Sequence, residues 1–179
     1  MEQGSPKQRP GHGSRRQGPK RTAKDRALGL LAVRWRSRDE VGRRLRQAGF
    51  AQEEIDEAIA DLTEVGLIED VRFARELVRD QASRRLAGDR AIRNALRQKG
   101  VAADVAEGAL REAGDEAGRA NDLASRRAIR LSGLAPDAAH RRLYGLLVRR
   151  GFPPGVAAEA TREALAAVFP EAGLGPADG

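Results

Sequence analysis

A pattern of leucine and glycine recurs along this chain with a period of 51 residues. In each copy a glycine follows a leucine by four positions, and another aliphatic residue stands four positions before the leucine. The three copies are Val41-Leu45-Gly49, Ile92-Leu96-Gly100 and Leu143-Leu147-Gly151. A spacing of four places two large side chains on one helical face, and glycine ends helices because it adopts the left-handed conformation at little cost. The pattern predicts three helices of one design at equal intervals.

The sequence around each copy extends this helix to a unit of three. After each glycine come an apolar residue, a short turn and an amphipathic segment, which starts near Ile55, Val105 or Val156. Before each copy lies another helical segment, at about residues 24–35, 70–85 and 115–131. Small helical modules bury their apolar faces by stacking on their neighbours. We therefore predict an all-α fold of three tandem three-helix repeats in an elongated, curved array, with units at residues 24–66, 67–114 and 115–169.

The composition agrees with a helical protein. Aromatic residues make up 3% of the 179 residues, and there is no cysteine. Disulfides, thiolate nucleophiles and thiolate metal sites are thereby excluded. A polar N-terminus without a signal-like apolar stretch, and the lack of a run of about 18 uncharged apolar residues, lead us to expect a cytoplasmic protein that does not span a membrane.

The basic charge of the chain is concentrated at its N-terminus. The net charge is +7, but residues 1–24 hold seven basic groups against one acidic group, which leaves 26 basic and 25 acidic groups in the remainder. Residues 1–23 are rich in Gly, Pro, Ser and Arg and too polar to form a core, so we expect a disordered basic tail that could contact single- or double-stranded DNA. Residues 170–179 are expected to form a frayed C-terminal tail.

The sequence offers little for catalysis. Its two histidines, His12 in the tail and His140 in a basic helical segment, do not belong to a cluster with metal-ligand spacing. Neither of the common glycine-rich nucleotide-binding motifs occurs. A lone Tyr144 next to Leu143 is more typical of a half-buried core residue than of a nucleophile. We therefore predict no catalytic residue, no metal and no cofactor.

Arginines gather around the second helix of each unit. They could form a repeated basic ridge for an acidic protein surface or a phosphate backbone, or they could be a solvated face balanced by nearby acids. Arg84 and Arg85 belong to the same clusters. The candidate partner-binding residues are Arg34, Arg36, Arg43, Arg44, Arg46, Arg90, Arg93, Arg97, Arg141, Arg142, Arg149 and Arg150.

Two blocks of sequence resemble the RecX family of bacterial regulators. Residues 27–41, with the segment Arg34-Trp35-Arg36-Ser37, resemble the family's opening: a leucine-rich helix, then R-x-R-S, then an acidic and an aliphatic residue. Residues 62–74 resemble its L-x-x-x-G-x-[LI]-x-D-x-x-[FY]-A segment. The resemblance covers about residues 26–112 in register, and the third repeat agrees more loosely. Glu69 departs from the Asp or Asn that is frequent there.

The resemblance implies a fold of three three-helix units and a function in recombinational DNA repair and the SOS response. Members of the family bind the RecA nucleoprotein filament and mostly inhibit its recombinase, ATPase and coprotease activities. On this basis we expect a monomeric, non-enzymatic regulator whose partner is the RecA filament. The alternative is a DNA-binding module of helix-turn-helix kind, in which one helix enters the major groove.

Overall fold

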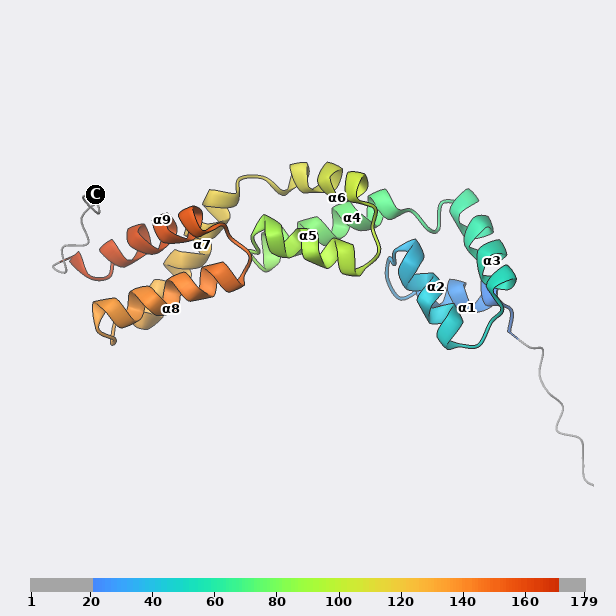
Figure 1. Cartoon of the computed structure of the whole chain (residues 1–179), viewed down its shortest axis with the longest axis horizontal. Helices are drawn as coiled ribbons and strands as arrows, with labels where there is room; N and C mark the ends of the chain where they lie inside the picture. Colours follow the sequence, from blue (N-terminus) through green and yellow to red (C-terminus); the bar gives the residue numbers. More distant parts are fainter. Residues whose placement is uncertain (1–20, 171–179) are drawn as a thin grey trace, which may run out of the picture.

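A computed structural model describes residues 21–170 of the chain. These residues form nine α-helices and no strand, in three groups that follow one another along an arch (Figure 1). The predicted N-terminal tail, apart from its last residues, and the residues after Pro170 lie outside the described part. The all-helical prediction is confirmed.

Each group of three helices forms one unit. Unit one consists of α1 (Ala23–Leu31), α2 (Arg38–Gln47) and α3 (Gln52–Glu64). Unit two consists of α4 (Asp70–Arg79), which continues as a π-helical turn (Asp80–Arg84), and of α5 (Asp89–Gln98) and α6 (Ala103–Leu110), with a 3₁₀ turn at Arg111–Ala113. Unit three consists of α7 (Glu116–Ala128) with a 3₁₀ turn at Ile129–Leu131, α8 (Pro136–Arg149) and α9 (Pro154–Ala166).

The repeated leucine and glycine hold the same place in every unit. Leu45, Leu96 and Leu147 are fully buried, one in each of three separate hydrophobic clusters. The glycines at 49, 100 and 151 follow the second helices with φ angles of +87°, +70° and +93°. A left-handed residue after a helix is the conformation that glycine was predicted to supply.

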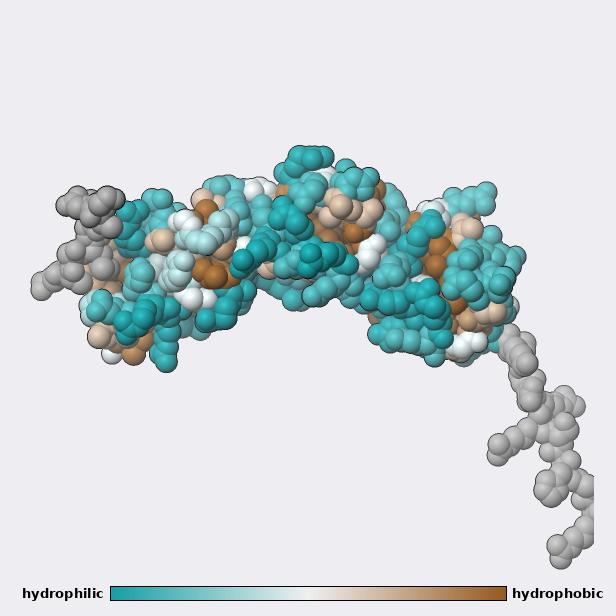
Figure 2. All heavy atoms as spheres, viewed as in Figure 1, coloured by the Kyte–Doolittle hydropathy of each residue, from teal (hydrophilic) through white to brown (hydrophobic). Residues whose placement is uncertain are grey.

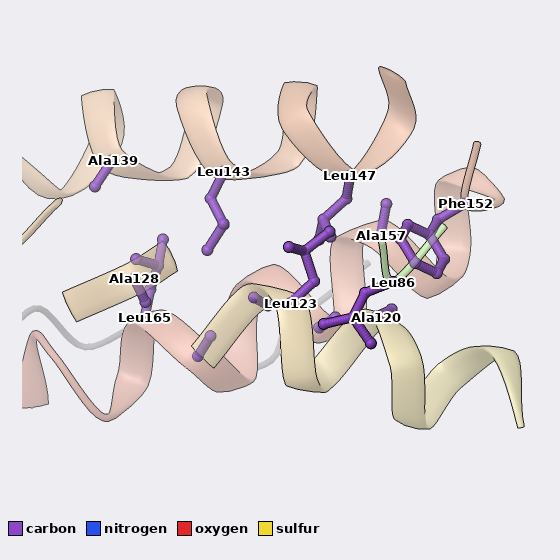
Figure 3. Packing of buried hydrophobic residues seen from close by; sticks show 13 residues of the cluster. Leu86, Ala120, Leu123, Ala128, Ala139, Leu143, Leu147, Phe152, Ala157 and Leu165 are labelled. Atoms are coloured by element: carbon purple, nitrogen blue, oxygen red, sulfur yellow. The ribbon is translucent and has the colours of Figure 1, made fainter. Parts of the chain in front are cut away.

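One residue of each preceding unit also packs on the core of the next. Trp35 packs against the cluster of unit two, and Leu86 is buried within the cluster of unit three. Figure 3 shows Leu86 among Ala120, Leu123 and Phe152. Trp35 and Leu86 are 51 residues apart, so the two joints between units use equivalent positions.

The first helical segment is shorter than the sequence predicts. We expected a helix to about Trp35, but α1 ends at Leu31. The chain turns there because Trp35 leaves unit one for the core of unit two, and the Arg36 guanidinium donates a hydrogen bond to the Leu30 carbonyl at 3.0 Å. A tertiary contact thus ends this helix before its apolar pattern does.

The second helices lie at the joints of the array. Figure 1 shows α5 and α8 along the inner side of the arch and α2 on the side of unit one that faces unit two. Hydrophilic residues cover most of this face of the molecule (Figure 2). The start of each of the helices α2 and α5 is contacted by the end of the next unit's second helix, through Ser37 with Lys99 and through Gly88 with Arg150.

Candidate partner-binding surface

The twelve arginines predicted to form the basic ridge fall into two groups. Six bond to acidic side chains or backbone carbonyls of the protein: Arg34, Arg36, Arg43, Arg90, Arg93 and Arg150. Within residues 21–170 the other six form no ion pair: Arg44, Arg46, Arg97, Arg141, Arg142 and Arg149. The structure does not bring all twelve together on one free surface.

Arg34 and Arg36 converge on the buried carboxylate of Glu40. Arg36 Nη1 lies 2.8 Å from Glu40 Oε1, Arg34 binds both carboxylate oxygens, and Lys99 of unit two approaches to 3.6 Å. Burial alone would raise the pKa of Glu40, but the hydrogen bond from Arg34 and the charges of Arg34, Lys99 and Arg36 outweigh it and lower this pKa. Arg36 is itself buried, so it belongs to the scaffold and cannot serve as an exposed contact.

Three further arginines reach across the joints. Arg43 donates to the Gln98 carbonyl at 3.3 Å, Arg90 to the Val148 carbonyl at 3.0 Å, and Arg150 to the Arg85 carbonyl at 2.7 Å. Each acceptor belongs to a neighbouring unit. These guanidiniums fix one unit against another, which is a structural role that the sequence clusters did not reveal.

Arg93 is tied to unit two's own third helix. Its guanidinium binds the carboxylate of Glu107 on α6 through Nε and Nη2. This hydrogen bond lowers the pKa of the Glu107 carboxyl and raises the pKa of Arg93. The pair is the solvated, acid-balanced arrangement that the sequence left open as an alternative to a binding ridge.

The six arginines without an ion pair are the ones available to a partner. All lie on α2, α5 or α8 and are exposed. They therefore recur on the same helix of every unit, and two of these helices, α5 and α8, lie along the inner side of the arch (Figure 1). We call these six residues the free second-helix arginines.

A larger concentration of arginine lies at the joint between units two and three. A hollow of about 590 Å³ is lined by seven arginines, and we call it the arginine hollow: Arg84, Arg85, Arg126, Arg127, Arg130, Arg149 and Arg150. Sequence reasoning missed Arg126, Arg127 and Arg130, which stand on α7 and the turn after it. The sequence does show Arg126-Arg127 as a further Arg-Arg pair, with Arg130 four residues after Arg126. Only the fold shows that this pair lies near the pairs at 84–85 and 149–150.

No group of three or more His, Asp or Glu side chains within residues 21–170 could hold a metal ion. Tyr144 stacks on His140, with ring centroids 6.3 Å apart, and packs against the core of unit three. None of the helices in this part of the chain combines the length and apolar character needed to cross a bilayer.

Comparison with known proteins agrees with this architecture. Residues 23–62 match the sequence model of a family described as RecX, first three-helix domain, and residues 70–110 match RecX, second three-helix domain. These ranges coincide closely with units one and two.

Relatives and solved structures extend the likeness to most of the chain. Regulatory protein RecX of Corynebacterium efficiens is 41% identical over 147 residues, which cover 78% of this chain and 70% of that protein. The protein of the same name from Prosthecochloris aestuarii is 39% identical over 134 residues, with 74% and 86% coverage. The crystal structure of RecX from Lactobacillus salivarius superposes with a TM-score of 0.69 at 26% identity, covering 79% of this chain and 94% of that one. The matches to two RecX three-helix domains, the similar relatives and the shared fold together show that the chain belongs to the RecX family.

Proposed function

We propose that this protein binds the RecA nucleoprotein filament and inhibits its recombinase, ATPase and coprotease activities. The observation that carries the proposal is the match of units one and two to the two RecX three-helix domains. The protein would act as a cytoplasmic monomer in recombinational repair and the SOS response, without catalysis and without a cofactor.

The geometry suits a long, regular partner. Three units repeat at 51 residues, and the second helix of each presents one or more exposed arginines that form no ion pair with residues 21–170. A filament likewise presents the same surface at regular intervals, so successive units can make equivalent contacts. Arginines that carry no internal ion pair can bind carboxylates of a partner without first losing a partner of their own.

The alternative function, a DNA-binding module of helix-turn-helix kind, fits the structure less well. Such a module inserts the N-terminal residues of its recognition helix into the major groove. The first turns of α2 and α5 are covered by the next unit, where Gly100 lies against Asp39 and Gly151 against Ala91. The third helix of unit one carries six acidic and no basic residues, which would repel phosphates.

The test is the ATPase of RecA on single-stranded DNA, with this protein titrated in. We expect inhibition at protein concentrations well below that of RecA. Arg44→Gln together with Arg97→Gln should raise the half-inhibitory concentration by about tenfold, because two exposed cations of the ridge are lost.

The matched control removes two other exposed arginines. Arg26 on α1 and Arg111 after α6 also form no ion pair in the described residues, and one lies in each of the same two units. Arg26→Gln with Arg111→Gln should leave inhibition unchanged at equal helicity. Equal losses in both double variants would mean that net charge, and not the second-helix surface, governs the effect.

A further inference from the structure

The arginine hollow is a concentrated positive site at the joint between units two and three. Arg84 ends the π-helical turn after α4 and Arg85 follows it. Arg126, Arg127 and Arg130 come from α7 and its extension, and Arg149 and Arg150 from the last residue of α8 and the one after it. The remaining lining is Gln81 with the apolar residues Leu86, Ala87, Ala91 and Leu123. The lining thus holds seven positive charges and no acidic residue.

Little of this charge is compensated within the protein. Asp80 pairs with Arg84 at 3.6 Å and with Arg85 at 3.3 Å, and it lies outside the lining. In the described part of the chain, Arg126, Arg127, Arg130 and Arg149 form no ion pair. Charges of one sign around an apolar floor repel one another and focus a positive potential into the hollow. An anion bound there would relieve that repulsion.

The walls of the hollow are held in place by the joint itself. Arg150 donates to the Arg85 carbonyl at 2.7 Å, and the Gly88 amide donates to the Arg150 carbonyl at 3.0 Å. Leu86, between these contacts, is buried in the core of unit three with a left-handed φ of +47°, which is uncommon for a residue other than glycine. A π turn followed by a left-handed leucine aims Arg84 and Arg85 at unit three, and such irregular backbone is often found at functional sites.

We infer that the arginine hollow binds a run of phosphate groups and that the bound ligand bridges units two and three. Guanidinium groups bind phosphate oxygens in bidentate fashion, and seven of them match a ligand that carries several negative charges close together. The polyphosphate of a nucleotide meets this condition most fully, and a nucleic-acid strand offers a regular row of phosphodiesters with one charge each. A polyphosphate concentrates more charge in the same length than a run of carboxylates does, so an acidic peptide fits less well.

Bridging has a structural consequence. The ligand would contact the end of α4 in unit two and the helices α7 and α8 in unit three, on either side of a joint that is already held by Leu86, by hydrogen bonds and by the Arg119–Asp89 ion pair. A ligand that binds only the folded protein stabilises it by an amount that grows with the logarithm of the ligand concentration above Kd. A phosphate ligand would therefore fix the angle between the two units and raise the stability of their joint.

The experiment uses the full chain without RecA, so that its outcome does not depend on the proposed function. Binding of inorganic tripolyphosphate is measured by isothermal titration calorimetry, and melting temperature is followed by circular dichroism. We expect one tripolyphosphate per chain and a melting temperature that rises with its concentration. Arg126→Gln with Arg130→Gln should weaken binding by about tenfold or more, because two charge-assisted contacts to the ligand are lost while no ion pair within residues 21–170 is broken.

A control variant in the same unit separates the hollow from general charge. Arg141→Gln with Arg142→Gln removes two exposed arginines of α8 that do not line the hollow, and it should bind tripolyphosphate as the parent does. Equal weakening in both variants, or no detectable tripolyphosphate binding at all, would overturn the proposal. Equal or tighter binding of hexaglutamate would overturn it too, in favour of an acidic protein surface.

An oligonucleotide distinguishes the two sources of phosphate. If twelve-residue oligothymidylate competes with tripolyphosphate and depends on Arg126 and Arg130, the natural ligand includes a nucleic-acid strand, with a log-log salt slope of roughly −0.7 per phosphate contacted. If the oligonucleotide does not compete while tripolyphosphate binds as expected, the ligand is a small polyphosphate. Either result supports a phosphate site in the arginine hollow.

Discussion

The two joints of the array use the same positions with different chemistry. At the first joint Trp35 packs against the next core, the Ser37 hydroxyl donates to the Lys99 carbonyl, and Lys99 approaches Glu40. At the second joint the residues 51 positions later are Leu86, Gly88 and Arg150, and there a backbone amide donates directly to a backbone carbonyl. Side chains make these contacts of the first joint. At the second joint backbone meets backbone, and side chains add to it, since the buried Arg119 of unit three binds Asp89 and the Ala87 carbonyl of unit two.

The helix starts at the two joints follow the same rule. The Arg38 amide at the start of α2 donates to Asp70 of unit two at 2.8 Å, and the Asp89 amide at the start of α5 donates to Glu116 of unit three at 2.7 Å. The first amide of α2 and that of α5 are thus each bound by an acidic side chain of the following unit. The repeat thus determines which positions lie at a joint, whereas the residue at each position determines how well the joint tolerates substitution. Substitutions at equivalent positions of the two joints can test this.

The repeated glycines should give the largest difference between joints. A Cβ built on Gly151 would lie 2.5 Å from the Ala91 backbone nitrogen, and one on Gly100 would meet the Asp39 side chain, whereas Gly49 has open space. All three have positive φ, so alanine at any of them costs about 1–2 kcal/mol. Gly151→Ala should cost roughly 1–3 kcal/mol more through overpacking against rigid backbone, measured as loss of unfolding free energy in urea.

Gly49→Ala is the control for this comparison, and Gly100→Ala should fall between the two because a side chain can move more easily than backbone. If all three substitutions cost the same, the close approach at the second joint contributes nothing to stability.

The next largest effect is expected from the residue that links units two and three. Leu86→Ala should destabilise unit three by about 2–3 kcal/mol, since a buried leucine is truncated in its core. Hydrogen exchange resolved by segment is the measurement, with faster exchange expected over residues 116–166 and little change over residues 23–64. Uniform acceleration along the chain would instead show that the units unfold as one.

The 51-residue period predicted the architecture because each unit is built from the same local sequence signals for helices and their ends. Leu45, Leu96 and Leu147 alternate with solvent-facing residues at helical spacing, and the glycines mark where those helices stop. What the pattern could not show is a contact between units. Asp70 is the first residue of α4, yet its carboxylate accepts from the Arg38 amide of unit one. The side chain of Glu69, the N-cap of α4, makes no capping hydrogen bond.

The candidate surface was predicted only in part, because contacts between units and between distant segments also decide which arginines are free. Arg36 and Arg44 look alike in sequence, since both stand in an arginine cluster near α2. Arg36 is buried against Glu40, a pairing that needs the chain to turn after α1, whereas Arg44 is exposed without an ion pair. The arginine hollow was missed because its members come from three stretches up to 66 residues apart, from Arg84 to Arg150.

The first joint should be the more sensitive of the two to acid. The pKa of Glu40 is lowered in the folded protein, so its contribution to stability is complete above its ordinary value of 4.5 and is lost as the pH falls through the lowered pKa. Fluorescence of Trp35, the only tryptophan in the chain, should report loosening of this joint below about pH 4.5 before helicity falls. Glu40→Gln should remove this pH dependence, and an unchanged profile in that variant would assign the transition to other carboxylates.

The smallest effect should come from the cation that covers Trp35. The Arg72 guanidinium lies 4.1 Å from the centre of the Trp35 ring, on α4 of the unit that receives this side chain. A cation–π contact at an exposed site contributes about 0.5–1 kcal/mol, so Arg72→Met, which keeps an unbranched chain over the ring, should reduce the unfolding free energy by no more than this. The Trp35 emission maximum should shift while the hydrogen exchange of unit three stays unchanged, because Leu86 has no such cover. A loss comparable to that of Leu86→Ala would mean that the first joint depends on this one contact, and that side-chain chemistry at the joints matters more than the shared position.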